Sequence, residues 1–126
     1  DDETKEFYRS IHSAARESGR SFQVPFRCDG NGLRRDMLLL VVPLKDGVLR
    51  LQGLLLDESQ SDPTHDHPSS CIKCSLCLCV DADGKTFDAA HLLPPEPSAS
   101  IRYQVCPTCR RLIEETNRPE PDQLLD

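Results

Sequence analysis

Six of the seven cysteines of this 126-residue chain lie between residues 71 and 109, mostly at Cys-x-x-Cys spacing. An odd cysteine count argues against a complete disulfide framework, whereas paired Cys-x-x-Cys motifs are typical of a thiolate metal site in a reducing compartment. Two cysteines separated by two residues can hold one ion from a single tight turn, and a second such turn completes a tetrahedral site. The sequence therefore predicts one structural Zn²⁺ ion and an intracellular protein of the nucleus or cytoplasm.

The four ligands that we predict are Cys71, Cys74, Cys106 and Cys109. The second pair suits a tight turn, because the proline between its cysteines presets φ. For the first pair, Cys74 with Cys77 is an alternative. Residues 76–80 alternate large and small apolar side chains, which favours a strand in which Cys77 and Cys79 are small buried residues. We therefore prefer Cys71 and Cys74 as the first pair.

The N-terminal half of the chain predicts a helix and a β-hairpin. Apolar residues recur at three- and four-residue spacing over residues 3–18, which is the pattern of an amphipathic helix. A short strand is expected over residues 21–26. Residues 37–44 and 48–56 then predict two strands joined by a turn at Lys45-Asp46-Gly47. We expect the helix to pack on one face of this hairpin and to form a core with it.

We predict an α+β protein. The composition divides the chain into four parts. Residues 1–57 form the helix and β-hairpin subdomain. Residues 58–70 are poor in large apolar side chains and rich in Ser, Asp, Pro and His, which predicts a linker. Residues 71–117 form a zinc-binding module, and residues 118–126 form an extended tail.

The expected elements of the zinc-binding module follow the order of a treble-clef fold. A hairpin with its turn at residues 81–85 follows the first cysteine pair. A strand over residues 101–105 precedes the second pair, and residues 110–117 have helical composition. The last two thiolates would then lie at a helix N-terminus, where the helix dipole favours negative charge.

The segment between the two cysteine pairs carries a further pattern, Phe87-Asp88-Ala89-Ala90-His91-Leu92-Leu93-Pro94. With the hairpin and the flanking cysteines, residues 71–117 resemble the zinc-stapled class of HNH endonucleases, in which a histidine after the hairpin acts as general base. The resemblance implies that His91 matches this base and Asp88 a neighbouring metal-site residue. The family's Asn before the second pair and His just after its last cysteine are absent, and Arg110 and Arg111 stand at the latter place. We therefore expect a degenerate member without catalytic residues, and His91 is catalytic only if the chain is HNH-like.

The second cysteine pair, followed by Arg110, is also similar to the last ligand pair of RING domains, in which two interleaved zinc ions present a ubiquitin-conjugating enzyme. A second ion needs four more ligands. Between Cys79 and Cys106 only His91 is available, while His65 and His67 precede the first pair and break the usual order. A RING-like ubiquitin ligase module is therefore a further alternative.

Charge and hydropathy restrict the partner. Fifteen Lys and Arg against twenty-one Asp and Glu give a net charge of −6, which opposes binding to a polyphosphate or an anionic membrane. No stretch approaches the roughly twenty apolar residues that span a bilayer, so no membrane partner is expected. We predict a non-catalytic zinc-binding interaction domain that presents a surface to a protein partner within a larger assembly. An HNH-like nuclease, or its inactive nucleic-acid-binding descendant, is the alternative.

Overall fold

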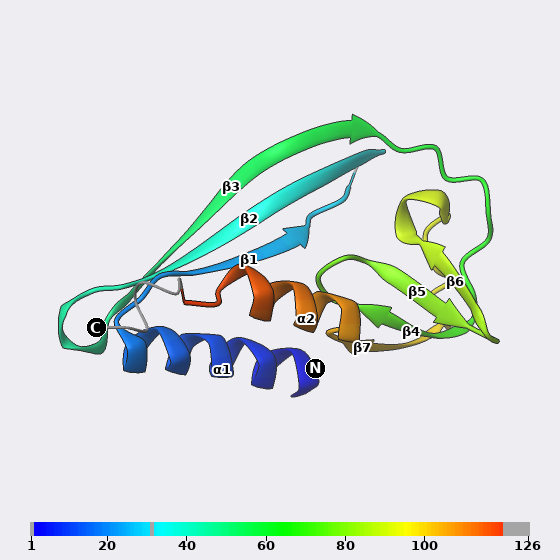
Figure 1. Cartoon of the computed structure of the whole chain (residues 1–126). Coiled ribbons are helices and arrows are strands. Elements are labelled where there is room, and N and C mark those ends of the chain that lie inside the picture. The colour runs from blue at the N-terminus through cyan, green and yellow to red at the C-terminus, as the bar shows by residue number, and fades with distance from the viewer. Residues whose placement is uncertain (1, 31, 120–126) are drawn as a thin grey trace.

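The computed structural model describes residues 2–30 and 32–119 and has an α+β fold (Figure 1). The first sheet is antiparallel in the order β1-β2-β3, with strands β1 (Phe22–Arg27), β2 (Leu33–Pro43) and β3 (Leu49–Gln60). The second sheet has the order β6-β5-β4-β7, with strands β4 (Ser70–Cys74), β5 (Cys79–Ala82), β6 (Lys85–Asp88) and β7 (Ser100–Gln104). The predicted fold class is confirmed.

Helix α1 (Asp2–Ser18) confirms the amphipathic helix at the start of the chain. Its buried residues Phe7, Ile11 and Ala15 are spaced by four, so they lie on one face. The helix ends where Gly19 adopts a φ of 69° and its N–H donates to the Ala15 carbonyl at 3.0 Å. Glycine adopts this left-handed conformation without the steric cost that a Cβ would add.

The predicted hairpin is formed by β2 and β3, which are joined by the short 3₁₀ turn η1 (Lys45–Gly47). Both strands are longer than expected, and β3 runs to Gln60, into the predicted linker. The reason is that polar residues extend the ladder: Arg35 of β2 forms an ion pair with Glu58 of β3 at 3.0 Å. Further along the predicted linker, the His65 N–H donates to the His91 carbonyl at 3.0 Å.

The segment after β4 differs from the predicted strand over residues 76–80. It is a turn followed by β5, which begins only at Cys79. The turn forms because the N–H groups of Leu76 and Cys77 point at the Cys74 sulfur, at 3.4 and 3.5 Å, and Leu78 takes a φ of 60°. The β5–β6 hairpin is observed as expected, as is strand β7. Helix α2 (Pro107–Thr116) starts directly after Cys106, earlier than the predicted residue 110.

One hydrophobic cluster joins both helices, the first sheet and the turn after β4. Figure 1 shows β1–β3 arching over α2, with α1 on the same side of the sheet. The cluster contains Phe7, Ile11, Ala15, Phe22, Val24, Val41, Cys74, Leu76, Val105, Cys109 and Ile113. Residues from the predicted subdomain 1–57 and module 71–117 therefore share a core, while the domain boundaries themselves stay a prediction.

Two remaining sequence expectations concern the tail and the membrane. Of the predicted tail 118–126, residues 120–126 lie outside the described residues. Among the residues that the structure describes, no helix has the length and apolar character needed to cross a bilayer.

Candidate metal centre

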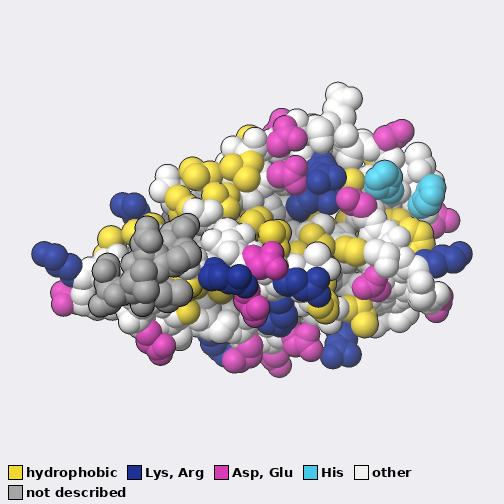
Figure 2. Space-filling model, in the orientation of Figure 1, with side chains coloured by type: hydrophobic (Ala, Val, Ile, Leu, Met, Phe, Trp, Pro, Cys, Tyr) yellow, Lys and Arg dark blue, Asp and Glu magenta, His cyan; other side chains and the backbone are white. Residues whose placement is uncertain are grey.

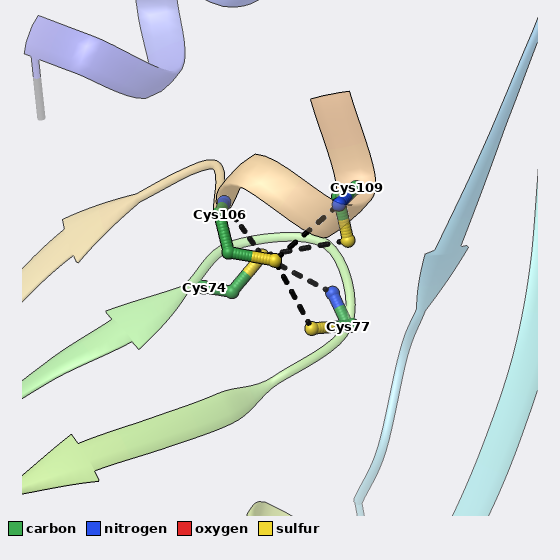
Figure 3. A group of neighbouring side chains, drawn as sticks. All are labelled: Cys74, Cys77, Cys106 and Cys109. Carbon is green, nitrogen blue, oxygen red and sulfur yellow. Dashed lines mark hydrogen bonds between the residues drawn. The ribbon is translucent and has the colours of Figure 1, made fainter. Parts of the chain in front are cut away.

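Four cysteines from two distant segments converge at the edge of the core, to which Cys74 and Cys109 belong (Figure 3). Cys74 is the last residue of β4 and Cys77 lies in the turn that follows it. Cys106 is the N-cap of α2 and Cys109 lies in the first turn of this helix. Their sulfur atoms all lie within 4.8 Å of one another. The turn after β4 and the first turn of α2 therefore face each other across one small space.

Two of the distances between the sulfurs match those expected around a tetrahedral metal ion. The sulfurs of Cys74 and Cys109 are 3.8 Å apart, and those of Cys77 and Cys106 are 3.9 Å apart. Four thiolates bound to one ion with bonds of about 2.3 Å would be about 3.8 Å apart. A disulfide needs about 2.05 Å between sulfurs, and all seven cysteines are free. The four cysteines could therefore hold a metal ion.

Backbone N–H groups point at two of the four sulfurs. The Cys74 sulfur accepts hydrogen bonds from the N–H groups of Leu76, Cys77 and Cys106 at 3.4–3.5 Å. The Cys106 sulfur accepts one from the N–H of Cys109 at 3.4 Å and so caps α2. The three N–H groups that point at the Cys74 sulfur favour its thiolate form, which is the form that a metal ion requires.

Three thiols of the cluster differ in pKa, because the hydrogen bonds between them favour ionisation of one over the other two. Hydrogen bonds with Cys109 and Cys77 lower the pKa of Cys74 strongly. The pKa of Cys109 is raised by its hydrogen bonds to Cys74 and Cys77 and by burial. A hydrogen bond with Cys109 lowers the pKa of Cys77, but its bond to Cys74 and burial outweigh this and raise the pKa to about 12. A bound cation would favour ionisation of the whole set, because it takes the place of these protons.

The structure brings together three of the four predicted ligands and replaces Cys71 with Cys77. Cys71 and Cys74 lie three positions apart on β4, so their side chains point to opposite faces of the sheet. Cys71 is buried in a second cluster with Val80 and Leu92. The alternative first pair, Cys74 with Cys77, is thus the one that meets the second pair. The sequence could have indicated Cys77 through the similarity of the two cysteine pairs. A strand precedes the second pair, and residues 70–74 form the corresponding strand before Cys77.

His91 and Asp88, which the HNH resemblance singles out, lie outside the cysteine cluster. His91 is exposed at the end of the short 3₁₀ helix η2 (Ala89–His91), and its carbonyl accepts the N–H groups of Thr64 and His65. Asp88 is held by Arg27 at 3.0 Å and by Arg34 at 3.6 Å. Within residues 2–30 and 32–119, the cysteine cluster is the only group of three or more potential metal ligands.

Arg27 connects the first sheet to the metal centre, a role that the sequence did not reveal. Its side chain is only 7% exposed and forms ion pairs with Asp29 and Asp88. It also donates to the Cys77 carbonyl at 3.2 Å, while its own N–H donates to the Leu76 carbonyl at 2.7 Å. Burial alone would lower the pKa of Arg27, but the hydrogen bonds to the two carboxylates raise it. This charged residue therefore fixes the turn that carries Cys77.

An apolar groove of about 490 Å³ lies between the first sheet, α2 and the β5–β6 hairpin. Its apolar lining comes from Phe26, Met37, Leu56, Leu76, Phe87 and Leu112. Leu56 and Leu112 are 59% and 48% exposed, so the groove carries apolar surface open to solvent. Cys77 and Cys109 line it as well, which places the groove directly against the metal centre.

Comparisons of the chain with protein-family models, with curated proteins and with solved structures gave no match. What the chain does is therefore inferred from the cysteine cluster and its surroundings.

Proposed function

We propose that this chain is a non-catalytic zinc-binding interaction domain, in which a treble-clef zinc module is stapled to a helix and a sheet that offer a groove to a protein partner. The observation that supports it most directly is the set of four sulfurs within 4.8 Å of one another, with two of their separations at 3.8 and 3.9 Å. Four protein ligands fill the coordination sphere of Zn²⁺, whereas catalytic zinc keeps an open position for water or substrate. A site of this kind stabilises a fold and takes no part in a reaction.

Zinc is the proposed metal because soft thiolates at tetrahedral angles suit it. A structural zinc ion contributes on the order of 10 kcal/mol to folding, which suits a chain with no Trp and four Phe. The test is elemental mass spectrometry on protein purified without added metal. One zinc per chain is expected. No metal would contradict the proposal, and two zinc ions per chain would favour the RING-like alternative.

The proposed binding surface is the apolar groove, because its rim leaves Leu56 and Leu112 exposed. Exposed apolar patches rimmed by polar residues are typical of protein-interaction sites. The net charge of −6 favours a partner segment that combines apolar anchors with basic residues. We therefore propose an apolar segment with basic flanks as the occupant.

A peptide display library selected on the metal-loaded chain tests this surface. Peptides with apolar anchors and basic flanks are expected to bind the wild type and to lose at least about tenfold in affinity with Leu112→Arg, because a charge then faces the groove. Leu44→Arg is the matched control, since Leu44 is also 48% exposed but lies beside the hairpin turn and not in the groove. Equal binding by all three proteins would remove the groove from the proposal.

The nuclease alternative has weaker support. Asp88 would have to leave two arginines to bind a hydrolytic metal, and no second metal-ligand group accompanies His91 in the described part of the chain. The assay is incubation with plasmid DNA and Mg²⁺ or Mn²⁺. We expect no cleavage by the wild type. Cleavage that disappears in His91→Ala would establish the alternative.

A further inference from the structure

Strand β3 is a long edge strand with an apolar character. It contains twelve residues and pairs with β2 on one side, while no strand of the described ranges 2–30 and 32–119 pairs with its other side. Leu51, Leu55 and Leu56 of β3 are 53%, 55% and 59% exposed. Figure 2 shows hydrophobic side chains gathered over this part of the sheet. Exposed edges of this kind are templates for pairing with another strand.

The hydrogen-bond pattern identifies which backbone groups of β3 are available. The N–H of Leu44 donates to the carbonyl of Val48 at 2.7 Å, which makes this a hydrogen-bonded pair of the β2–β3 ladder. Hydrogen-bonded and non-hydrogen-bonded pairs alternate in an antiparallel ladder. Residues 50, 52 and 54 therefore point their backbone groups at β2. Residues 49, 51, 53 and 55 point theirs at the open edge.

The charges of β3 are complementary to those of a second β3 strand that lies antiparallel to it. Arg50 lies near one end and Asp57 near the other, and within the described residues neither forms an ion pair. If Gly53 lies opposite Gly53 of a second copy, Leu51 faces Leu55 of that copy. Leu56 has no partner in the β2 register, so it is the extra residue of a bulge. Beyond it, Arg50 faces Asp57 of the second copy on the same side of the sheet.

We propose that β3 pairs antiparallel with β3 of a second copy of this chain, centred on Gly53, to form a two-fold symmetric dimer with a continuous six-stranded sheet. Leu51 lies opposite Val41 in the β2 ladder, and Val41 is fully buried in the core. Directly opposed residues lie on one face of a sheet, so Leu51 and Leu55 share the face that carries the helices. The two-fold axis is perpendicular to the sheet. The exposed leucines of both copies then meet on one side.

Charge reversal tests the proposed pairing in the metal-loaded chain. Sedimentation velocity over a range of concentrations is expected to show wild-type protein passing into a species of twice the 14.1 kDa chain mass. Arg50→Asp or Asp57→Arg places two like-charge pairs in the dimer and is expected to weaken association about tenfold. An equimolar mixture of the two variants restores both opposite-charge pairs. Association of the mixture is expected to return to the wild-type level.

Lys45→Asp is the matched control for net charge, because Lys45 is exposed in the turn of the same hairpin but lies outside the paired register. It makes the same change in charge as Arg50→Asp and is expected to leave association within about twofold of the wild type. Circular dichroism of each variant checks that the monomer folds. A wild type that stays monomeric at all concentrations would overturn the proposal, as would a mixture that associates no better than the single variants.

Discussion

At the residue scale, Cys74 makes the most hydrogen bonds of the four clustered cysteines. Its sulfur accepts three backbone N–H groups and lies 3.8 Å from the sulfur of Cys109. The position of Cys77 depends instead on the turn after β4. Arg27 holds this turn by donating a hydrogen bond to the Cys77 carbonyl. The same few residues thus fix both the ligand set and its attachment to the first sheet.

Single-cysteine variants distinguish the proposed ligand Cys77 from Cys71, which lies on β4. Cys77→Ala removes one of the four sulfurs and is expected to lower the apparent metal affinity by a factor of about 100 or more. Cys71→Ala is the matched control, because this thiol is buried in the second cluster and lies outside the centre. Metal content after dialysis against a weak chelator is the measurement. Loss of metal from the Cys71 variant alone would reverse the assignment.

Asp88→Asn tests the clamp formed by Arg27. The pKa of Asp88 tends upward on burial, but its hydrogen bond from Arg27 lowers it below the ordinary value, so the carboxylate is ionised at neutral pH and its stabilisation is fully present there. Removing this charge leaves Arg27 buried with one carboxylate partner. We expect a loss of about 1–3 kcal/mol in the free energy of unfolding. Urea denaturation of metal-loaded protein at pH 7 measures it, and an unchanged midpoint would contradict the role given to the clamp.

At the element scale, α2 joins the metal centre to the first sheet. Its first turn supplies Cys109, and its C-cap residue Asn117 reaches β1. The Asn117 side chain accepts the Gln23 N–H at 2.7 Å and donates to the Gln23 carbonyl at 2.9 Å. The backbone of an edge strand is thereby paired with a single side chain, which holds the far end of the helix against the sheet.

Asn117→Ala is expected to loosen this attachment without touching the metal ligands. Two side-chain hydrogen bonds to β1 are lost, which should cost about 1–2 kcal/mol in stability. Thr116→Ala, at the exposed neighbouring position, is the control and is expected to cost less than about 0.5 kcal/mol. Thermal unfolding of the metal-loaded variants gives both values. Equal melting temperatures for the two variants would show that the contact contributes nothing.

At the scale of the whole molecule, the cysteine cluster belongs to the main core. Cys74 and Cys109 pack in one cluster with Phe7 of α1 and Val41 of β2. If the proposed zinc ion is bound there, its loss would leave the thiols of Cys74 and Cys109 in this core without the ion that links them. The consequence should therefore reach beyond residues 71–117.

Chelation tests the shared core by hydrogen exchange. After metal removal with EDTA, we expect amides of β1 and β2 to lose protection together with those of β4 and α2, because one cluster stabilises all four elements. Mass-spectrometric hydrogen exchange on peptides from each element is the measurement. If β1 and β2 keep their protection while the module unfolds, the two parts are independent, as the predicted domain boundaries would suggest.

Local spacing in the sequence determined much of this protein. The period of apolar residues in α1, the turn residues of the β2–β3 hairpin and the second cysteine pair each depend on neighbours within a few positions, and each was predicted. The tertiary structure decided between Cys71 and Cys77, because the face on which a cysteine lies depends on where β4 ends and the turn begins. It also decided that Arg27 would hold that turn and that both halves would share one core, since these contacts join residues about fifty or more positions apart.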